Sequence, residues 1–562
     1  MAKITIDGRT FDVDPKLTVI QAARENGIEI PHFCWHPKLS VAGNCRMCLV
    51  EIEKMPKLAI ACATQVADGM VVHTDTERVG KARNAVMEFL LINHPLDCPI
   101  CDEAGECKLQ DYAYKYSVGT SRFDEDKVHK PKRVELGPRV MLDVERCIMC
   151  SRCIRFSDEI ARQPVLTFTE RGTHVVLATF PGTQLDNPYS MNVIELCPVG
   201  ALTSRDFRFR SRVWEMSATE SVCVGCERGC NTSVWVRNNE ILRLTPRQND
   251  EVNSSWMCDE GRLSTFKQVN SDRRLHGPLV RKDGAHVEVG WDEAISRVVS
   301  ELRTYKKHEI AGIASPFATN EDNYVFLRLM REVLGVKQIG LADHVVAGSE
   351  DDLLLRAEKS PNRLGARTVA GLPDNHTALN EVLNAISAGT IKALYVLEDN
   401  IAALPGVAEV LANLDLLIVH ASERNETTAI ADVVLSASTY AEKNGTFTNF
   451  QGRVQRIRPA VATLDHERSL DGLAMSRWDR FAAHNDRWGK GPRRDSRSSW
   501  RILAAVANAL GGRIKYTTAE EVFREMADRI PAFKGLTYLK VGPGGTPLQA
   551  PVDAPQRTRV QS

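Results

Sequence analysis

The sequence predicts a multidomain protein that combines α+β and α/β regions. Its 562 residues are 43% hydrophobic, enough for several cores and too many for one ordinary domain. All fifteen cysteines lie in the first 258 residues, among short strands and polar loops. Beyond about residue 275, helical segments alternate with short apolar runs, which is typical of an α/β domain with a largely parallel sheet.

Hydrophobic periodicity and turn residues predict the individual elements. In the first half we expect strands within 3–13 around the Asp7-Gly8 turn, at 49–53 and at 70–73, and helices at 19–26 and 78–91. Pro95 and Pro99 prevent the second helix from continuing. In the second half we expect helices at 291–305, 321–334 and 499–510, and strands at 310–314, 393–397 and 416–419. Residues 464–499 read as an insertion or mobile linker and 516–562 as a C-terminal tail.

Composition argues against several classes of protein. The 72 basic and 72 acidic residues cancel, so a nucleic-acid binder with a broad basic face is disfavoured. We expect neither a transmembrane segment nor a secretory signal, because long apolar runs are missing. An odd number of cysteines in a long chain does not suit a disulfide framework. We therefore expect a reducing compartment, where clustered thiols serve as metal ligands or redox groups.

The spacing of twelve cysteines predicts three four-ligand sites, named here by their first members. The Cys34 set resembles the plant-type ferredoxin arrangement, with a longer first gap, and favours a 2Fe-2S cluster. The Cys147 set combines the Cys-x2-Cys-x2-Cys triple with a remote Cys-Pro and favours one 4Fe-4S cluster. The Cys223 set favours another 4Fe-4S cluster. A zinc site is the alternative, chiefly for the Cys34 and Cys223 sets. The three sets are Cys34, Cys45, Cys48 and Cys62; Cys147, Cys150, Cys153 and Cys197; and Cys223, Cys226, Cys230 and Cys258.

Three remaining cysteines, Cys98, Cys101 and Cys107, lack a fourth thiol. His94 stands four positions upstream in a proline-interrupted loop, and a neutral imidazole nitrogen is a competent metal ligand. A lone histidine is more often a surface or core residue, but this one precedes three orphan thiols. We predict that the four residues form the His94 set and hold a 4Fe-4S cluster. The count then closes at sixteen ligands, with no thiol left for nucleophilic catalysis and no catalytic residue predicted.

The order of these sets resembles the large iron-sulfur subunits of NADH-quinone oxidoreductase (respiratory complex I). The resemblance spans residues 1 to about 515 and is carried by 42–50, 94–107, 146–156, 256–262 and 442–455. It implies an N-terminal β-grasp ferredoxin-like 2Fe-2S domain (1–78) and an iron-sulfur domain with one histidine and three cysteine ligands (79–118). A 4Fe-4S ferredoxin-like domain (119–217) and a 4Fe-4S domain of molybdopterin-oxidoreductase type (218–274) would follow, and then a molybdopterin-oxidoreductase-like α/β domain (275–515).

The resemblance also implies a function and partners. Electrons from NADH, oxidised at a flavin in a partner subunit, would enter at the Cys34 set and pass to the Cys147 set and the His94 set. A ferredoxin-like 4Fe-4S partner would lead them to quinone, and the Cys223 set would lie off this path. The chain would hold no complete active site and would belong to the peripheral arm, on the cytoplasmic side of the bacterial inner membrane. Neutral His94 and the nearby Arg146, Arg152 and Arg155 would raise potentials, although ordinary salt bridges are an equal reading of the arginines.

Three alternatives stay open at this point. A formate dehydrogenase catalytic subunit has the same order of clusters in front of a molybdenum site. However, no cysteine follows Cys258 to serve as a molybdenum ligand, and Glu260 stands where such enzymes usually carry a lysine. We therefore expect no molybdopterin. The electron-input subunit of an iron hydrogenase shares the N-terminal half, and a non-redox scaffold with four zinc ions would fit the same ligands.

Overall fold

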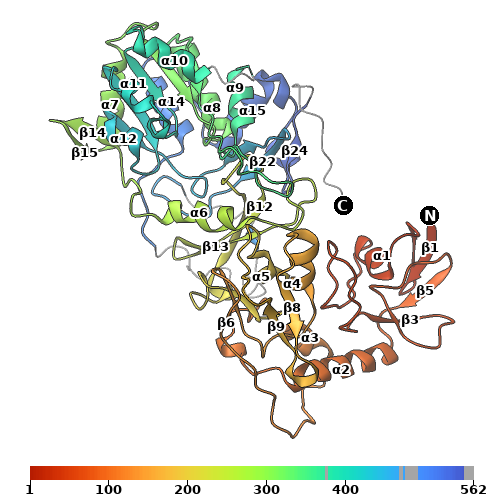
Figure 1. The fold of residues 1–562 in the computed structure, drawn as a ribbon. Coiled ribbons are helices and arrows are strands. Elements are labelled where there is room, and N and C mark those ends of the chain that lie inside the picture. Colours follow the sequence, from red (N-terminus) through yellow and green to blue (C-terminus); the bar gives the residue numbers. More distant parts are fainter. Residues whose placement is uncertain (374–377, 467–472, 475–490, 550–562) are drawn as a thin grey trace. The chain divides into compact units, whose positions relative to one another are not determined.

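The computed structural model describes residues 1–373, 378–466, 473–474 and 491–549 (Figure 1). The chain divides into two compact units, Met1–Glu215 and Met216–Gln561, and each is described by itself. In the described residues, no helix is both long and apolar enough to cross a membrane.

The first unit begins with a five-stranded mixed sheet in the order β2-β1-β5-β3-β4. Its strands are β1 (Ala2–Ile6), β2 (Arg9–Val13), β3 (Leu49–Ile52), β4 (Ala59–Ile60) and β5 (Met70–His73). Helix α1 (Val19–Glu25) begins at a Thr18–Gln21 capping box and buries its apolar face against the sheet. Strand β1 pairs parallel with β5 and antiparallel with β2, as expected for a β-grasp domain.

The rest of the first unit consists of short elements joined by cysteine-bearing loops. Helix α2 (Glu77–Ile92) begins where Thr76 accepts a hydrogen bond from the Val79 amide, and it ends three residues before Pro95. The other elements are η1 (Cys98–Ile100), α3 (Lys108–Tyr116), β6 (Val134–Glu135), β7 (Val140–Leu142), α4 (Arg152–Arg155), η2 (Phe156–Ile160), β8 (Leu166–Thr169), η3 (Gly172–His174), β9 (Val176–Thr179), α5 (Asn192–Leu196), β10 (Leu202–Ser204) and η4 (Val213–Glu215). Strands β10, β7 and β6 form one small sheet, and β8 and β9 form a hairpin.

The second unit opens with an antiparallel sheet in the order β13-β12-β11-β23. The strands are β11 (Ser217–Val222), β12 (Asn231–Arg237), β13 (Glu240–Pro246) and β23 (Leu473–Ala474). Helix α6 (Asp259–Asn270) lies against β13. This sheet was not anticipated from the sequence, because its strands carry polar residues at buried positions: Ser217, Thr219 and Ser221 are all buried.

A seven-stranded sheet in the order β15-β14-β20-β19-β18-β16-β17 forms the centre of the second unit. Its strands β16 to β20 are mutually parallel, whereas the β14–β15 hairpin adds an antiparallel edge. The strands are β14 (Leu279–Lys282), β15 (Ala285–Glu288), β16 (Ile310–Ala314), β17 (Ile339–Leu341), β18 (Ala393–Val396), β19 (Leu416–Ala421) and β20 (Val433–Ser436). The largely parallel sheet confirms the predicted α/β class.

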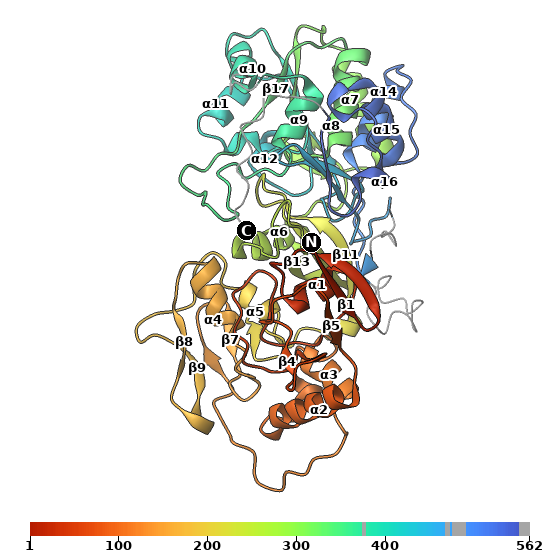
Figure 2. The same cartoon turned by 90° about the vertical axis from the view of Figure 1, so that its right-hand side faces the viewer.

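Helices cover both faces of this sheet, so that it separates two apolar cores (Figure 2). Helices α7 (Trp291–Leu302), α8 (Asn320–Leu327), η5 (Arg328–Val333), α9 (Arg363–Ala370), α14 (Ser499–Ala509) and α15 (Ala519–Arg529) pack on one face. Helices α10 (Ala378–Ser387) and α11 (Val407–Leu411) pack on the other. The remaining elements are η6 (Ile401–Ala403), α12 (Glu426–Ile430), β21 (Gly445–Thr448), β22 (Arg453–Ile457), η7 (Pro531–Phe533), α16 (Tyr538–Val541) and β24 (Thr546–Pro547).

The predicted tail at 516–562 is wrong for 516–549. Phe523, Met526 and Phe533 are fully buried in the larger core, and β24 pairs with β22. The Gly- and Pro-rich composition after Val541 concealed this, because the inward-facing apolar residues are few. Residues 550–562 lie outside the described residues.

The predicted linker at 464–499 is also partly wrong. Residues 491–499 pack into the second unit, where the Trp291 indole donates a hydrogen bond of 2.9 Å to Asp495. Ser496 and Ser499 are fully buried. Within the predicted linker, residues 467–472 and 475–490 lie outside the described residues.

Candidate metal centres

The Cys34 set gathers in the N-terminal β-grasp domain. Cys34 lies in the loop after α1, Cys48 directly precedes β3, and Cys62 follows β4. All three are buried, and Cys45 is half-buried. The Cys34 amide donates to the Cys45 Sγ at 3.5 Å, and hydrogen bonds from the Cys45 and Cys62 thiols lower the pKa of Cys34. The structure thus brings the four predicted ligands of this set together.

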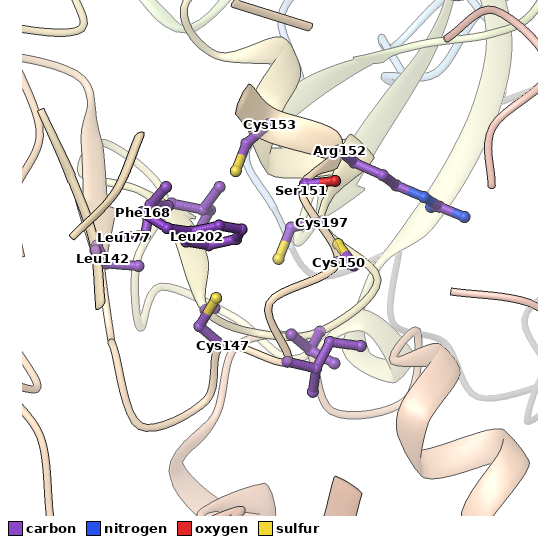
Figure 3. Close-up of a pocket in the computed structure, with 13 residues that line it drawn as sticks. Leu142, Cys147, Cys150, Ser151, Arg152, Cys153, Phe168, Leu177, Cys197 and Leu202 are labelled. Atoms are coloured by element: carbon purple, nitrogen blue, oxygen red, sulfur yellow. The ribbon is translucent and has the colours of Figure 1, made fainter. Parts of the chain in front are cut away.

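The Cys147 set lines a cavity, and its four sulfur atoms lie around one space (Figure 3). Two of the four residues between the first three cysteines adopt left-handed conformations, with φ of 54° at Met149 and 62° at Ser151. These turns wrap the Cys-x2-Cys-x2-Cys loop around the cavity, while Cys197 arrives from the end of α5. Apolar side chains close the remaining walls, namely Leu142, Ile148, Phe168, Leu177, Val199, Ala201 and Leu202.

Burial raises the pKa of Cys147 to about 11, so this thiol is neutral until a cation arrives. Thiols give up their protons when they bind metal, and four soft donors around an apolar cavity match the requirements of an iron-sulfur cluster. The residues of the Cys147 set therefore fit a 4Fe-4S cluster.

The His94 set occupies the turns between α2 and α3. His94 follows the end of α2, Cys98 begins η1, and Cys107 directly precedes α3. Burial, together with the positive charges of Arg146 and Lys127, lowers the pKa of His94 to about 4. The imidazole is thus neutral at pH 7, the form that binds metal. Burial raises the pKa of Cys101, and the positive charge of Arg146 partly opposes this rise. Cys98 is the single exposed cysteine among the fifteen.

The Cys223 set belongs to the second unit, at one end of the β11–β12 pair. All four cysteines are buried, and Cys258 is the N-cap of α6, where its Sγ accepts from the Gly261 amide at 3.3 Å. A Cβ atom on Gly261 would lie 2.9 Å from the Cys223 sulfur. Only glycine therefore lets the first turn of α6 approach both thiols, a requirement that the spacing alone did not reveal.

Arginines join the Cys34 and Cys147 sets within the first unit. The buried Arg152 guanidinium donates to the carbonyl of Trp35, next to Cys34, at 2.5 Å and to that of Leu196, next to Cys197, at 3.2 Å. Arg155 donates to the Cys34 carbonyl and, at 3.4 Å, to the Cys150 carbonyl. The interpretation as an ordinary surface salt bridge is therefore wrong for Arg152, because its side chain is buried and donates to backbone carbonyls beside ligands of both sets.

The Cys197-Pro198 segment joins the Cys147 and His94 sets. The Pro198 carbonyl accepts from the Lys108 amide at 3.1 Å and from the Cys107 thiol at 3.8 Å. A Cβ on Gly200 would overlap the Cys101 sulfur. Gly200, which touches Cys101 of the His94 set, is therefore only three positions along the chain from Cys197 of the Cys147 set. The Cys147 set thus contacts segments that carry ligand candidates of both other sets of the first unit.

A buried ionic network fills the carboxyl edge of the parallel sheet in the second unit. The Lys443 ammonium donates to Asp322 at 2.8 Å and to Glu398 at 2.7 Å, and the Ser499 hydroxyl donates to Glu398 at 2.6 Å. Burial alone would lower the pKa of Lys443, but the two carboxylates raise it, so the ammonium stays charged. Strand order reverses between β17 and β18 around β16, and such switch points are where doubly wound sheets bind ligands. Here protein side chains occupy that edge.

Five family models match consecutive parts of the chain. They are a 2Fe-2S iron-sulfur cluster binding domain (1–77), an NADH-ubiquinone oxidoreductase-G iron-sulfur binding region (83–122) and an NADH-quinone oxidoreductase subunit 3 ferredoxin-like domain (137–203). An NDSU1/NuoG-like 4Fe-4S domain (216–265) and a molybdopterin oxidoreductase model (274–374 and 357–469) follow.

Curated relatives agree with these matches. The G-type subunit of the NADH-quinone oxidoreductase of Rickettsia bellii is 40% identical over 402 residues, which cover 70% of this chain and 57% of the relative. The chain belongs to the family of NADH-quinone oxidoreductase G-type subunits. The mitochondrial NADH-ubiquinone oxidoreductase 78 kDa subunit of Neurospora crassa is 42% identical over 60% of this chain and 46% of its own length. This member of the G-type family thus spans about half the length of the curated relatives it matches.

Chains of solved structures are also similar. A chain from an NAD+-reducing [NiFe]-hydrogenase in the H2-reduced state is 31% identical, with a TM-score of 0.35, over 38% of this chain and 91% of that one. At this TM-score the likeness carries no argument about the fold or function of the G-type chain.

Proposed function

We propose that the chain is an electron-transfer subunit of an NADH-quinone oxidoreductase. It would hold one 2Fe-2S cluster at the Cys34 set and three 4Fe-4S clusters at the Cys147, His94 and Cys223 sets. When bound, the clusters supply one-electron carriers whose potentials depend on ligand type, nearby charge, hydrogen bonding and burial. The chain itself contributes the sixteen ligands and the fixed charges around them.

The observation that carries this proposal is the continuous path of contacts through the first unit. Arg152 and Arg155 tie the Cys34 loop to the Cys147 set, and Pro198 and Gly200 tie the Cys147 set to the His94 set. Electron transfer in series requires neighbouring sites, and this arrangement supports the order Cys34, Cys147, His94. The Cys223 set belongs to the second unit, and its place off the path is proposed from the family resemblance.

The partners follow from the family. Electrons would come from NADH through a flavin in a partner subunit and would leave towards quinone through a ferredoxin-like 4Fe-4S subunit. The chain would then lie in the peripheral arm on the cytoplasmic side of the bacterial inner membrane, attached to the membrane only through the complex.

The alternatives receive less support. Molybdopterin does not fit the carboxyl edge of the parallel sheet, because two buried carboxylates already pair with Lys443 there. This argues against a formate dehydrogenase. A zinc scaffold is disfavoured because the family models that match the four ligand sets are iron-sulfur or ferredoxin-like domains, and the curated relatives are named as oxidoreductase subunits.

Metal analysis combined with EPR of the purified full-length chain tests the proposal. We expect about fourteen iron atoms per chain, from one 2Fe-2S and three 4Fe-4S clusters, without molybdenum or tungsten. In membranes containing the assembled complex, NADH should reduce the clusters of the first unit. Stoichiometric molybdenum would favour the formate dehydrogenase, and a colourless zinc protein would favour the scaffold.

A further inference from the structure

A long hairpin connects β17 to α9 in the second unit. Its two arms, within residues 343–359, are joined by backbone hydrogen bonds such as the one from the Lys359 amide to the His344 carbonyl, at 3.0 Å. Most of its tip, 345–352, is exposed. Leu354, 4% exposed, is the single buried apolar side chain of this fully described segment, and it belongs to neither core of the parallel sheet. Segments with so few buried apolar contacts open at a lower free energy than core strands and helices.

The hairpin lies on the loop that carries Cys226. Glu227 and Arg228 directly follow this cysteine. The Arg228 guanidinium donates to the Leu354 carbonyl at 3.1 Å, and the Glu227 amide donates to the Glu358 carbonyl at 3.1 Å. One arm of the hairpin is thus anchored to the two residues that follow a proposed cluster ligand.

The same arm reaches the ligand sulfur itself. Burial raises the pKa of the Cys226 thiol, and hydrogen bonds from the backbone amides of Arg228 and Arg356 oppose this rise. Arg356 belongs to the hairpin. If the hairpin moved away, the Cys226 sulfur would lose one hydrogen bond, and water would reach it. Hydrogen bonds to sulfur and exclusion of solvent are two of the means by which a protein controls an iron-sulfur cluster.

The other three ligands of the Cys223 set stand on regular elements. The Cys223 amide donates to the Cys230 carbonyl at 2.8 Å, at the end of the β11–β12 pair, and Cys258 is the N-cap of α6. Access to the set from these sides would require the sheet or the helix to unfold. The 343–359 hairpin is therefore the part of the covering structure that opens at the lowest cost.

Two polar contacts hold the hairpin in place. Near the set, the Arg356 guanidinium pairs with Glu227 at 3.0 Å and lies 4.3 Å from the centre of the Phe450 ring. At the base of the hairpin, the His344 imidazole lies 3.0 Å from the buried Asp399 carboxylate. Partly solvated contacts of this kind contribute little stability each, so they can break without loss of the fold.

We propose that residues 343–359 form a movable cover over the Cys223 set, which controls how fast the cluster of this set exchanges iron with the solution. This proposal rests on the proposed function, because it requires a cluster at the Cys223 set. In the closed position the Arg356 amide contacts the Cys226 sulfur. In the open position the Arg356 and His344 contacts are broken, while both cores of the parallel sheet stay packed.

The purified full-length chain with its clusters allows the test. The reduced chain is mixed, without oxygen, with an excess of bathophenanthroline disulfonate, which binds ferrous iron. The EPR signal that Cys258→Ala abolishes reports the Cys223 cluster. Arg356→Met removes the charge but keeps an unbranched side chain, and it should speed the loss of this signal roughly fivefold. The signals of the first unit should decay as in the unaltered chain.

Arg501→Met, in α14, is a matched control. Arg501 pairs with Asp465 at 3.2 Å, and the two side chains are 34% and 18% exposed, against 35% and 16% for Arg356 and Glu227. Arg501 also lies 5.1 Å from the centre of the Trp500 ring. This variant should leave the decay of the Cys223 signal unchanged. Equal acceleration in both variants, or acceleration of all signals by Arg356→Met, would overturn the proposal, because the effect would then be a general loss of stability.

Hydrogen exchange measures the opening of the cover directly. In Arg356→Met the backbone amides of 343–359 should exchange faster by the same factor as the Cys223 signal decays, because both processes pass through the open position. His344→Phe keeps an aromatic ring next to Phe317 but cannot pair with Asp399, and it should raise both rates in parallel. Faster loss of iron without faster exchange in 343–359, or unchanged rates in both variants, would overturn the cover. If the unaltered chain showed no EPR signal that depends on Cys258, the proposed function itself would be refuted at this set.

Discussion

At the scale of single residues, His94 supplies the sixteenth ligand that four predicted clusters of four ligands each require. Without it, three thiols would have to hold a cluster alone, and one iron atom would have no protein ligand. Its buried position and its lowered pKa, about 4, keep the ring neutral over the physiological range. This environment is what a nitrogen ligand requires, and it was not visible in the sequence, because Arg146 and Lys127 lie more than thirty positions away.

We predict that His94→Ala removes or reshapes one low-temperature EPR signal while the other signals persist. The variant His73→Ala, on β5, serves as the control, because this half-exposed histidine pairs with Glu53 away from the proposed ligands. A spectrum of His94→Ala that matches the unaltered chain would exclude ligation by this residue.

A second residue-scale prediction concerns the buried ion pair of Arg274 and Glu442. Their atoms are 2.6 Å apart, and the side chains are 0% and 1% exposed. Although burial alone would raise the pKa of Glu442, Arg274 lowers it below the ordinary value. Glu442→Gln leaves a buried charge without its partner and should destabilise the second unit by about 3–5 kcal/mol at pH 7.

The pH dependence of this effect follows from the lowered pKa. A carboxylate with a depressed folded-state pKa contributes stability above its unfolded pKa and loses it as pH falls through the folded value. Hydrogen exchange at pH 7 and at pH 4 measures the free energy of unfolding of the second unit. The difference in this free energy between Glu442→Gln and the unaltered chain should be smaller at pH 4 than at pH 7. Glu293→Gln, which removes the exposed ion pair with Lys282, is the control and should change the free energy of unfolding by less than about 0.5 kcal/mol at both pH values. A larger stability difference at pH 4 than at pH 7 would contradict a lowered pKa of Glu442 in the folded state.

At the scale of elements, helix α4 places a fixed charge between two ligand sets. Arg152, its first residue, is buried and donates to carbonyls beside both the Cys34 set and the Cys147 set. A nearby cation stabilises the reduced, more negative form of a cluster. Arg152→Met should lower the midpoint potential of the Cys147 cluster by on the order of 90 mV, which corresponds to a loss of about 2 kcal/mol of stabilisation of the reduced state for one electron.

The measurement is an EPR-monitored redox titration, and Arg152→Lys, which keeps the charge, should recover most of the potential. If the Met variant titrated at the original potential, Arg152 would only have a packing role.

The turn between α5 and β10 supplies another element-scale prediction. Gly200→Ala would place a Cβ in overlap with the Cys101 sulfur and 3.0 Å from the Cβ of Glu103. We expect the EPR signal of the His94 cluster to be lost while that of the Cys34 cluster remains. Gly80→Ala, in α2 with no atom within 4 Å of the new Cβ, should instead stabilise the helix by about 1 kcal/mol. Retention of both signals in Gly200→Ala would show that the turn can shift away.

At the scale of the whole molecule, residues 516–549 complete the core of the second unit. Phe533 is fully buried, whereas Leu539 is 89% exposed only six positions later. Phe533→Ala should destabilise the second unit by about 3–5 kcal/mol, and Leu539→Ala should stay within about 0.5 kcal/mol. Urea unfolding of the second unit, followed by limited proteolysis, measures both effects. Equal midpoints for the two variants would mean that this segment is not part of the core.

Much of the fold class could be predicted because its signals are local. The strand at 310–314 and the helix starting at 291 agree with β16 and α7, since buried parallel strands are continuous apolar runs and surface helices are amphipathic. The β11–β13 sheet escaped prediction because its buried positions include Ser217 and Thr219, which lack an apolar alternation. The packing of residues 516–549 into the core was not predicted, because polar residues, Gly and Pro outnumber the few inward-facing aromatic residues of this segment.

The sequence alone predicts the ligand sets, because most members of each set lie within a few positions of one another and their spacing resembles that of known cluster-binding motifs. Spacing says nothing of how one set faces another. The tertiary structure alone shows that the Cys147 set contacts segments of both other sets and that Arg152 bridges ligand sets 116 positions apart, as from Cys34 to Cys150. It also shows that Lys443 occupies the edge of the parallel sheet. Such contacts arise from packing between distant segments, which no local pattern encodes.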